Sequence, residues 1–172
     1  MILKIGGCLF ILFSSVVLGV YYSFKTEYRI SDLLEMKKAF TLLMAEIQFN
    51  LSPLAEAMKN VSSKVKNPVN KIFKEFSDKL GDCDKNAEEL WKCVLLENLK
   101  YSYFEKEDIE SFISFGKTLG YLDVKQQSNN IEMALSYIEL KTSELFEKSQ
   151  KDKKMYRSLG FFGGVVIMVI LI

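Results

Sequence analysis

Residues 123–172 read DVKQQSNNIEMALSYIELKTSELFEKSQKDKKMYRSLGFFGGVVIMVILI, and this stretch decides the fold of the chain. It contains no proline, and its first glycine is Gly160. Asp123 and Gln126 have the spacing of a capping box, which begins a helix. Apolar residues then recur at helical spacing and predict one buried stripe: Ile131, Ala134, Leu135, Ile138, Leu145 and Phe146. We expect one helix here, or two nearly coaxial ones.

A basic cluster and an apolar segment follow that stripe. The cluster consists of Lys148, Lys151, Lys153, Lys154 and Arg157. Leu159–Ile172 then carries no charged or polar side chain. Fourteen helical residues span about 21 Å, less than the ~30 Å of a bilayer core. We predict a short C-terminal transmembrane helix, 158–172, with the basic cluster beside anionic lipid headgroups.

The amino terminus predicts a second membrane segment. Residues 5–24 are apolar or small, which is enough for about 30 Å of helix. The run is longer than the apolar part of a signal peptide and no A-x-A site follows it, so we favour a retained N-terminal transmembrane anchor, 1–25. Basic residues gather on the inner flanks of both segments, which places 26–157 in the cytoplasm and both termini across the membrane.

Small residues predict how the two membrane segments pack. Gly160 and Gly164 form a GxxxG pair, and Ser15 and Gly19 form a second pair at the same spacing. Such pairs allow two helices to approach closely. We therefore expect an antiparallel hairpin, either within one protomer or between neighbours.

We predict an all-α fold for the chain. Residues 26–157 would form a six-helix antiparallel bundle, flanked by the N-terminal and the short C-terminal transmembrane helix. Six helix starts are indicated by capping residues and prolines: Asp32 with Glu35, Ser52-Pro53, Asn67-Pro68, Asp84, Glu105 and Asp123. The core side is expected to include Leu33, Leu34, Phe40, Leu43, Ile47, Val69, Ile72, Phe73, Phe76, Leu80, Leu90, Trp91, Val94, Leu95, Ile109, Phe112, Ile113 and Phe115.

Composition argues against several classes of function. Residues 26–147 have a net charge of −5, whereas a nucleic-acid binder would show a basic stripe. The chain has no histidine, and its three cysteines lack metal-ligand spacing, so we expect neither a metal site nor a cofactor. Gly116-Lys117-Thr118 resembles the end of a P-loop, but Ser111 stands where the motif needs glycine. Without a nucleophile beside a base, we expect no enzyme.

Three polar residues are candidates for partner binding. Asp123 and Gln127 are one helical turn apart, although they are explained more simply if Asp123 is a helix cap and Gln127 a solvated or loop-bonding residue. Glu46 lies beside the predicted core stripe and is expected to pair with a buried basic residue, for which Arg29 is a candidate. Asn50 and Asn60 begin N-glycosylation patterns, to which we assign a structural role because they lie in a cytoplasmic region.

Three short motifs resemble those of the stage III sporulation protein AB family of endospore-forming bacteria. They are Glu46-Ile47 with Ser52-Pro53-Leu54-x-Glu56-Ala57, then Leu119-Gly120-x-x-Asp123-x-x-x-Gln127, and finally Tyr156-Arg157-Ser158-Leu159-Gly160. The resemblance covers essentially the whole chain. It implies a soluble domain similar to the cytoplasmic domain of the type II secretion inner-membrane platform protein, which is also a bundle of six helices.

The resemblance also implies a function. Such a chain would be a membrane-anchored structural platform of the channel complex between mother cell and forespore, located in the mother-cell membrane around the forespore. Its implied partners are the cytoplasmic ATPase of that complex, stage III sporulation protein AA, and other stage III sporulation complex proteins. The alternative is a small bitopic sensor or pore-forming membrane protein without enzymatic activity.

Overall fold

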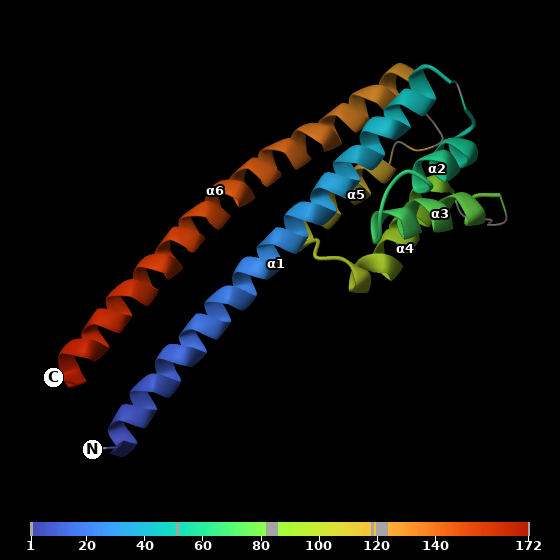
Figure 1. Cartoon of the computed structure of the whole chain (residues 1–172). Coiled ribbons are helices and arrows are strands. Elements are labelled where there is room, and N and C mark those ends of the chain that lie inside the picture. Colours follow the sequence, from blue (N-terminus) through green and yellow to red (C-terminus); the bar gives the residue numbers. More distant parts are fainter. Residues whose placement is uncertain (1, 51, 82–85, 118, 120–123, 172) are drawn as a thin grey trace. The chain divides into compact units, whose positions relative to one another are not determined.

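The computed structural model describes residues 2–50, 52–81, 86–117, 119 and 124–171, with side chains described for 24–50, 52–81, 86–117, 119, 125–152 and 155. All regular structure in these residues is helical, which confirms the predicted all-α class (Figure 1). The elements are α1 (Ile2–Gln48), α2 (Leu54–Ser62), α3 (Val69–Lys79), α4 (Ala87–Asn98), the 3-10 turn η1 (Leu99–Tyr101), α5 (Lys106–Gly116) and α6 (Val124–Leu171).

The chain divides into two compact units. One consists of residues 29–142 and therefore holds α2 to α5 with the adjoining parts of α1 and α6. The other combines residues 1–28 with residues 143–172. Among the described residues, no helix combines the length and hydropathy that a membrane crossing requires. The predicted segments 5–24 and 159–172 fall almost entirely on residues whose side chains lie outside the description, so both stay predictions.

Both long helices are continuous. α6 is a single helix of 48 residues, which decides between the one-helix and two-helix alternatives for 123–172. α1 also runs unbroken for 47 residues, so the helix start predicted at Asp32 and Glu35 is wrong. The helix continues past Asp32 because residues 8–48 contain no proline, and Gly19 is their only helix-destabilising glycine.

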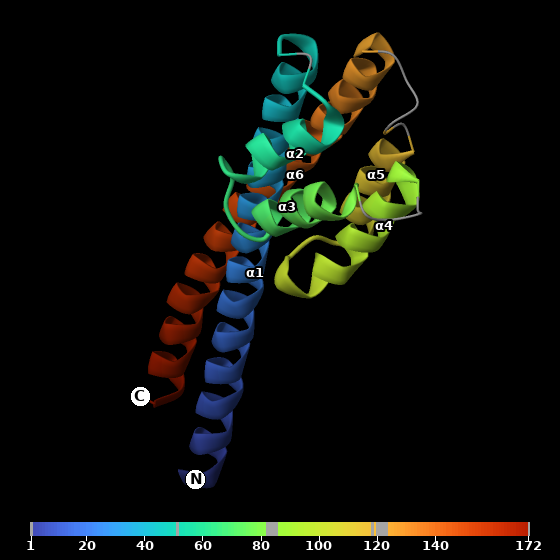
Figure 2. The ribbon, with the colours of Figure 1, turned by 90° about the vertical axis from the view of Figure 1, so that its right-hand side faces the viewer.

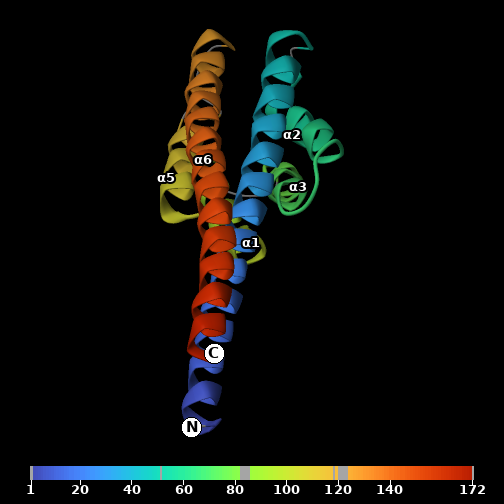
Figure 3. The same ribbon diagram turned by 60° about the vertical axis from the view of Figure 1, so that its left-hand side comes forward.

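Within the unit 29–142, α1 and α6 run antiparallel. Lys37 of α1 pairs with Glu139 of α6 at 2.9 Å, and Gln48 donates a hydrogen bond to Ser128 at 2.9 Å, so numbers rise along one helix as they fall along the other. Figure 3 shows these two helices side by side. The short helices do not all follow this direction, because α3 runs across α1 in both Figure 1 and Figure 2.

Helix starts at the prolines differ from the prediction by one residue. Pro53 and Pro68 are the N-cap residues of α2 and α3, and neither Ser52 nor Asn67 caps its helix. The fourth helix begins at Ala87, where the side chain of Asn86 accepts a hydrogen bond from the Glu89 amide, while Asp84 lies outside the described residues. The start at Glu105 is confirmed, since Glu105 and Asp108 form a capping box on α5.

Aromatic rings from four helices form the core of this unit. Phe40 of α1 lies 4.7 Å from Phe115 and 5.9 Å from Phe112, centroid to centroid. Trp91 of α4 contacts Phe115 at 5.4 Å and Phe73 at 5.6 Å, both edge to face. Most of the predicted core positions on these helices are buried, but Leu34 is 43% exposed, and Leu80, Ile109 and Ile113 are only half-buried. On α6, Leu135 is half-buried and Phe146 is 48% exposed, so Phe146 does not belong to the stripe.

Candidate docking surface and the polar network behind it

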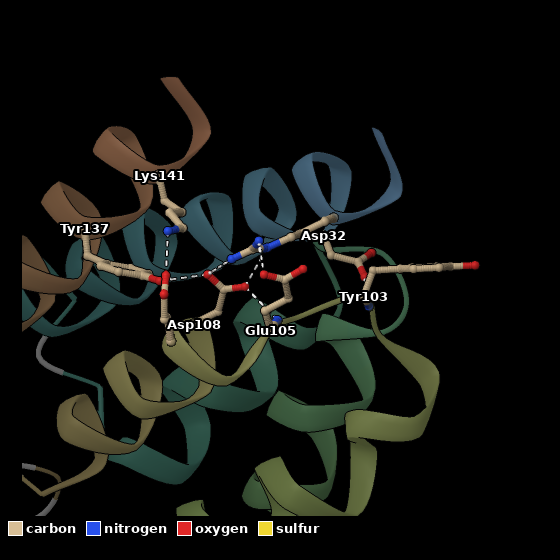
Figure 4. A network of polar contacts seen from close by, with 8 residues as sticks. Asp32, Tyr103, Glu105, Asp108, Tyr137 and Lys141 are labelled. Carbon is tan, nitrogen blue, oxygen red and sulfur yellow. Dashed lines mark hydrogen bonds and ion pairs between the residues drawn. The ribbon is translucent and has the colours of Figure 1, made fainter. Parts of the chain in front are cut away.

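A buried ion pair joins α1 to α5 near the start of the unit 29–142. The Arg29 guanidinium donates to both carboxylate oxygens of Asp108, from Nε at 2.9 Å and from Nη2 at 3.0 Å (Figure 4). Arg29 also contacts Glu105 at 2.5 Å. The Asp108 side chain is fully buried and that of Arg29 is 7% exposed. Burial opposes the charge of Arg29, but the hydrogen bonds and the charge of Asp108 raise its pKa.

The Asp108 carboxylate also holds α6 in place. The Tyr137 hydroxyl donates to Asp108 Oδ1 at 2.8 Å, and the Glu105 amide donates to Oδ2 at 2.8 Å. Burial, followed by the hydrogen bond to Asp108, raises the pKa of Tyr137, so this hydroxyl stays a donor at neutral pH. Asp108 therefore has its acceptor sites occupied by groups from α1, α5 and α6, and it is a structural junction.

Asp32 has a role that the sequence did not suggest. It lies in the middle of α1, where its carboxylate accepts a hydrogen bond of 2.8 Å from the backbone amide of Tyr103. Burial raises its pKa, and the Tyr103 amide partly offsets this effect. Asp32 thus attaches the segment after η1 to α1, whereas we predicted that it would cap a helix.

Glu46 is found at the opposite end of this part of α1. Its carboxylate accepts hydrogen bonds from Asn50 at 2.9 Å, Ser52 at 3.2 Å and Asn60 at 3.4 Å. Lys64 pairs with it at 3.5 Å and is half exposed. The expected pairing of Glu46 with Arg29 is therefore wrong, because Arg29 is taken by α5. Glu46 is 5% exposed and closes the connection between α1 and α2.

The two N-glycosylation patterns acquire a plain structural explanation. Asn50 and Asn60 each direct their amide group at Glu46, and the Ser52 hydroxyl does the same. A carboxylate that accepts several hydrogen bonds is stabilised in its charged form. Accordingly the hydrogen bond from Asn50 lowers the pKa of Glu46; burial acts against it, and Asn60, Ser52 and Lys64 reinforce it.

One hydrogen bond brings the two stretches chosen for partner binding together. The Gln48 side chain donates to the Ser128 hydroxyl, so the end of α1 adjoins the first turns of α6. Gln127 is half-buried beside this contact, and Asp123 lies outside the described residues. Phe49, directly after Gln48, is 80% exposed, which is the largest exposure of any large apolar side chain described. We call this end, residues 46–50 with 125–128, the distal end.

The P-loop-like triplet also has a structural explanation. Gly116 is the last residue of α5 and is buried. A methyl group added to it would overlap the indole ring of Trp91, so glycine is needed for the close approach of α4 and α5. Lys117 is exposed, and Thr118 lies outside the described residues. Among the side chains described, no group of three metal-binding residues occurs, and the Cys93 thiol donates to the Glu97 carboxylate at 3.3 Å.

Most of the residues predicted to act at the membrane lie beyond the described side chains. This applies to Ser15, Gly19, Gly160 and Gly164, and to Lys153, Lys154 and Arg157 of the basic cluster. Lys148 and Lys151 are described and exposed, and Lys151 lies 3.9 Å from Glu147 in a weak pair within α6. Their exposure agrees with a solvated surface.

We expect the Glu46 contacts to make the protein sensitive to acid. Since the folded pKa of Glu46 is lowered from 4.5, its contribution to stability is present above pH 4.5 and disappears as the pH falls further. Glu46→Gln should lower the melting temperature at pH 7, and the difference from wild type should shrink in acid. Glu56→Gln, an exposed acid in α2, is the control. A difference that stays constant from pH 7 to acid would contradict the prediction.

The described residues form a helical scaffold, in which polar groups hold the helices together and an exposed aromatic side chain marks one end. Residues 4–172 match the family described as Stage III sporulation protein AB, and the chain therefore belongs to that family.

Two relatives support this assignment. The chain is 28% identical over 169 residues to stage III sporulation protein AB of Bacillus subtilis (strain 168), covering 98% of this chain and 99% of the relative. A solved structure of stage III sporulation protein AB superposes with a TM-score of 0.66 at 27% identity, covering 73% of this chain and 98% of the other. The predicted resemblance is thus confirmed.

Proposed function

We propose that this protein is a membrane-anchored structural platform of the mother cell–forespore channel complex and that it docks the cytoplasmic ATPase of that complex. Membership of the sporulation family supports the setting. The observation that carries the docking role is the distal end, where the hydrogen bond between Gln48 and Ser128 brings two separate family motifs together beside the exposed Phe49.

The distal end has the composition of a protein interface. Aromatic side chains are frequent among the residues that dominate binding energy, and Phe49 offers a ring that solvent surrounds. Glu46 is buried and already bonded, so it shapes the surface by holding Asn50 and Ser52, and it does not contact the partner. The platform needs no catalytic group, and we propose that the protein has neither enzymatic activity nor a cofactor.

Membrane attachment follows from the sequence. The segments 5–24 and 159–172 would anchor the protein in the mother-cell membrane around the forespore, with the unit 29–142 in the cytoplasm. The distal end belongs to the unit 29–142 and would therefore be accessible to a soluble ATPase.

The docking surface can be tested with one pair of variants. Phe49→Ser should weaken binding to stage III sporulation protein AA at least tenfold, which is about 1.4 kcal/mol. Leu140→Ser is the control, because Leu140 is 64% exposed on α6 away from the distal end. We expect less than a twofold change for it. Binding is measured by biolayer interferometry on the full chain in nanodiscs, and equal losses for the two variants would contradict the proposed surface.

A further inference from the structure

Two lysines lie close to the exposed Phe49 at the distal end, and the first of them approaches from the α2 side. The Lys64 ammonium group lies 3.5 Å from the Glu46 carboxylate, and the Lys64 side chain is 52% exposed. The same carboxylate accepts a hydrogen bond from Asn50, the residue directly after Phe49. Lys64 is therefore held beside the turn that carries the Phe49 ring, and its charge is still accessible to a partner.

The second lysine, Lys125, approaches the same turn from α6. Gln48 donates to Ser128, and because α1 and α6 run antiparallel, the residues before Ser128 lie level with those after Gln48 (Figure 1). Lys125 precedes Ser128 by three residues, about 4.5 Å along the helix axis, in the direction in which Phe49 follows Gln48. Its side chain is exposed and forms no ion pair with another described residue. Phe49 thus has a lysine on either side.

Negative charge at the distal end is withdrawn from the surface. Glu46 is the one acid among its described residues, and it is 5% exposed, with its oxygens occupied by the donors of α2 and of the turn. The next exposed acids described along the chain are Glu56 of α2 and Glu132 of α6, outside both stretches. The distal end therefore presents an apolar ring and two ammonium groups to a partner, without an exposed carboxylate in the part that the structure describes.

We infer that the surface of the ATPase that binds the distal end is an apolar pocket rimmed by carboxylates. The inference rests on the proposed docking of the ATPase and adds the chemistry of the contact. A pocket removes the Phe49 ring from water, which stabilises the complex once it has formed. Carboxylates opposite Lys64 and Lys125 attract the partner before contact, which raises the association rate constant. The lysines thus govern how fast the complex forms, and the ring governs how long it lasts.

The test measures binding kinetics of the full chain in nanodiscs of phosphatidylcholine, which has no net charge, against stage III sporulation protein AA by biolayer interferometry. Lys64→Gln with Lys125→Gln should lower the association rate constant at least about fivefold at about 50 mM salt, and less than about twofold at about 500 mM, because salt screens charges. The dissociation rate constant should change less than about twofold. Phe49→Ser should act in the opposite way and mainly raise the dissociation rate constant.

Lys74→Gln with Lys92→Gln is the matched control, because both lysines are exposed, on α3 and α4, and the change in net charge is the same. Lys125→Gln alone should lower the association rate constant at least about twofold, and it leaves the pair between Lys64 and Glu46 intact. Equal effects of the test and control pairs, an effect that salt does not reduce, or faster association without the lysines would overturn this inference and leave docking through Phe49 intact. Equal binding losses for Phe49→Ser and Leu140→Ser would overturn both.

Discussion

Replacing Arg29 with alanine is expected to lower the free energy of unfolding of the unit 29–142 by about 3–5 kcal/mol, which is the usual cost of breaking a buried ion pair. The Asp108 side chain is fully buried and would lose both of its bonds from the guanidinium. Tyr137 and the Glu105 amide would still donate to it, but they carry no positive charge. The buried carboxylate would then be left without a counter-charge.

Trp91 supplies the readout for this experiment. It is the single tryptophan of the chain and is fully buried in the unit concerned, so its fluorescence reports unfolding in urea. The matched control is Lys106→Ala, which removes an ion pair between exposed side chains, 3.8 Å from Glu110 on α5. That change should cost no more than about 1 kcal/mol. Similar losses of unfolding free energy for the two variants would show that the buried Arg29–Asp108 pair stabilises the unit no more than an exposed ion pair does.

Replacing Trp91 with alanine should cost about 3–5 kcal/mol through the cavity that it leaves. The indole ring contacts Phe73, Phe76 and Phe115 edge to face, with centroids 5.4–5.6 Å away. It also donates a hydrogen bond of 2.7 Å to the carbonyl of Phe112. Gly116 leaves no side chain that could move into the space, so the rings of α3 and α5 would lose contacts together.

The size of this effect is best judged against a substitution on the same helix. Leu96 of α4 is 44% exposed, and Leu96→Ala should change the stability by only about 0.5 kcal/mol. Hydrogen–deuterium exchange of the full chain measures both variants without a fluorescent probe. Faster exchange across α3, α4 and α5 is expected for Trp91→Ala alone. Unchanged protection in that variant would mean that the aromatic core is not the main source of stability.

Local patterns in the sequence predicted the helices and most of the core. Phe40, Trp91 and Phe112 are buried as expected, because an apolar stripe at helical spacing has to be covered whatever covers it. The same patterns were wrong at one helix start. Asp32 has the spacing of a cap, but no proline or glycine stops α1 there, and its carboxylate is used by Tyr103, 71 residues away.

The choice of polar partners was decided only by the tertiary structure. Arg29 binds Asp108 across 79 residues of chain, and Glu46 contacts Asn60 of α2 and Lys64 just after that helix. A hydrogen bond needs donor and acceptor within about 3 Å, and only the packed helices set that distance. The sequence by itself determined that these helices form and which stripe each one buries, because both depend on neighbouring residues. Which charges meet, and which motifs share the distal end, depended on how the helices pack.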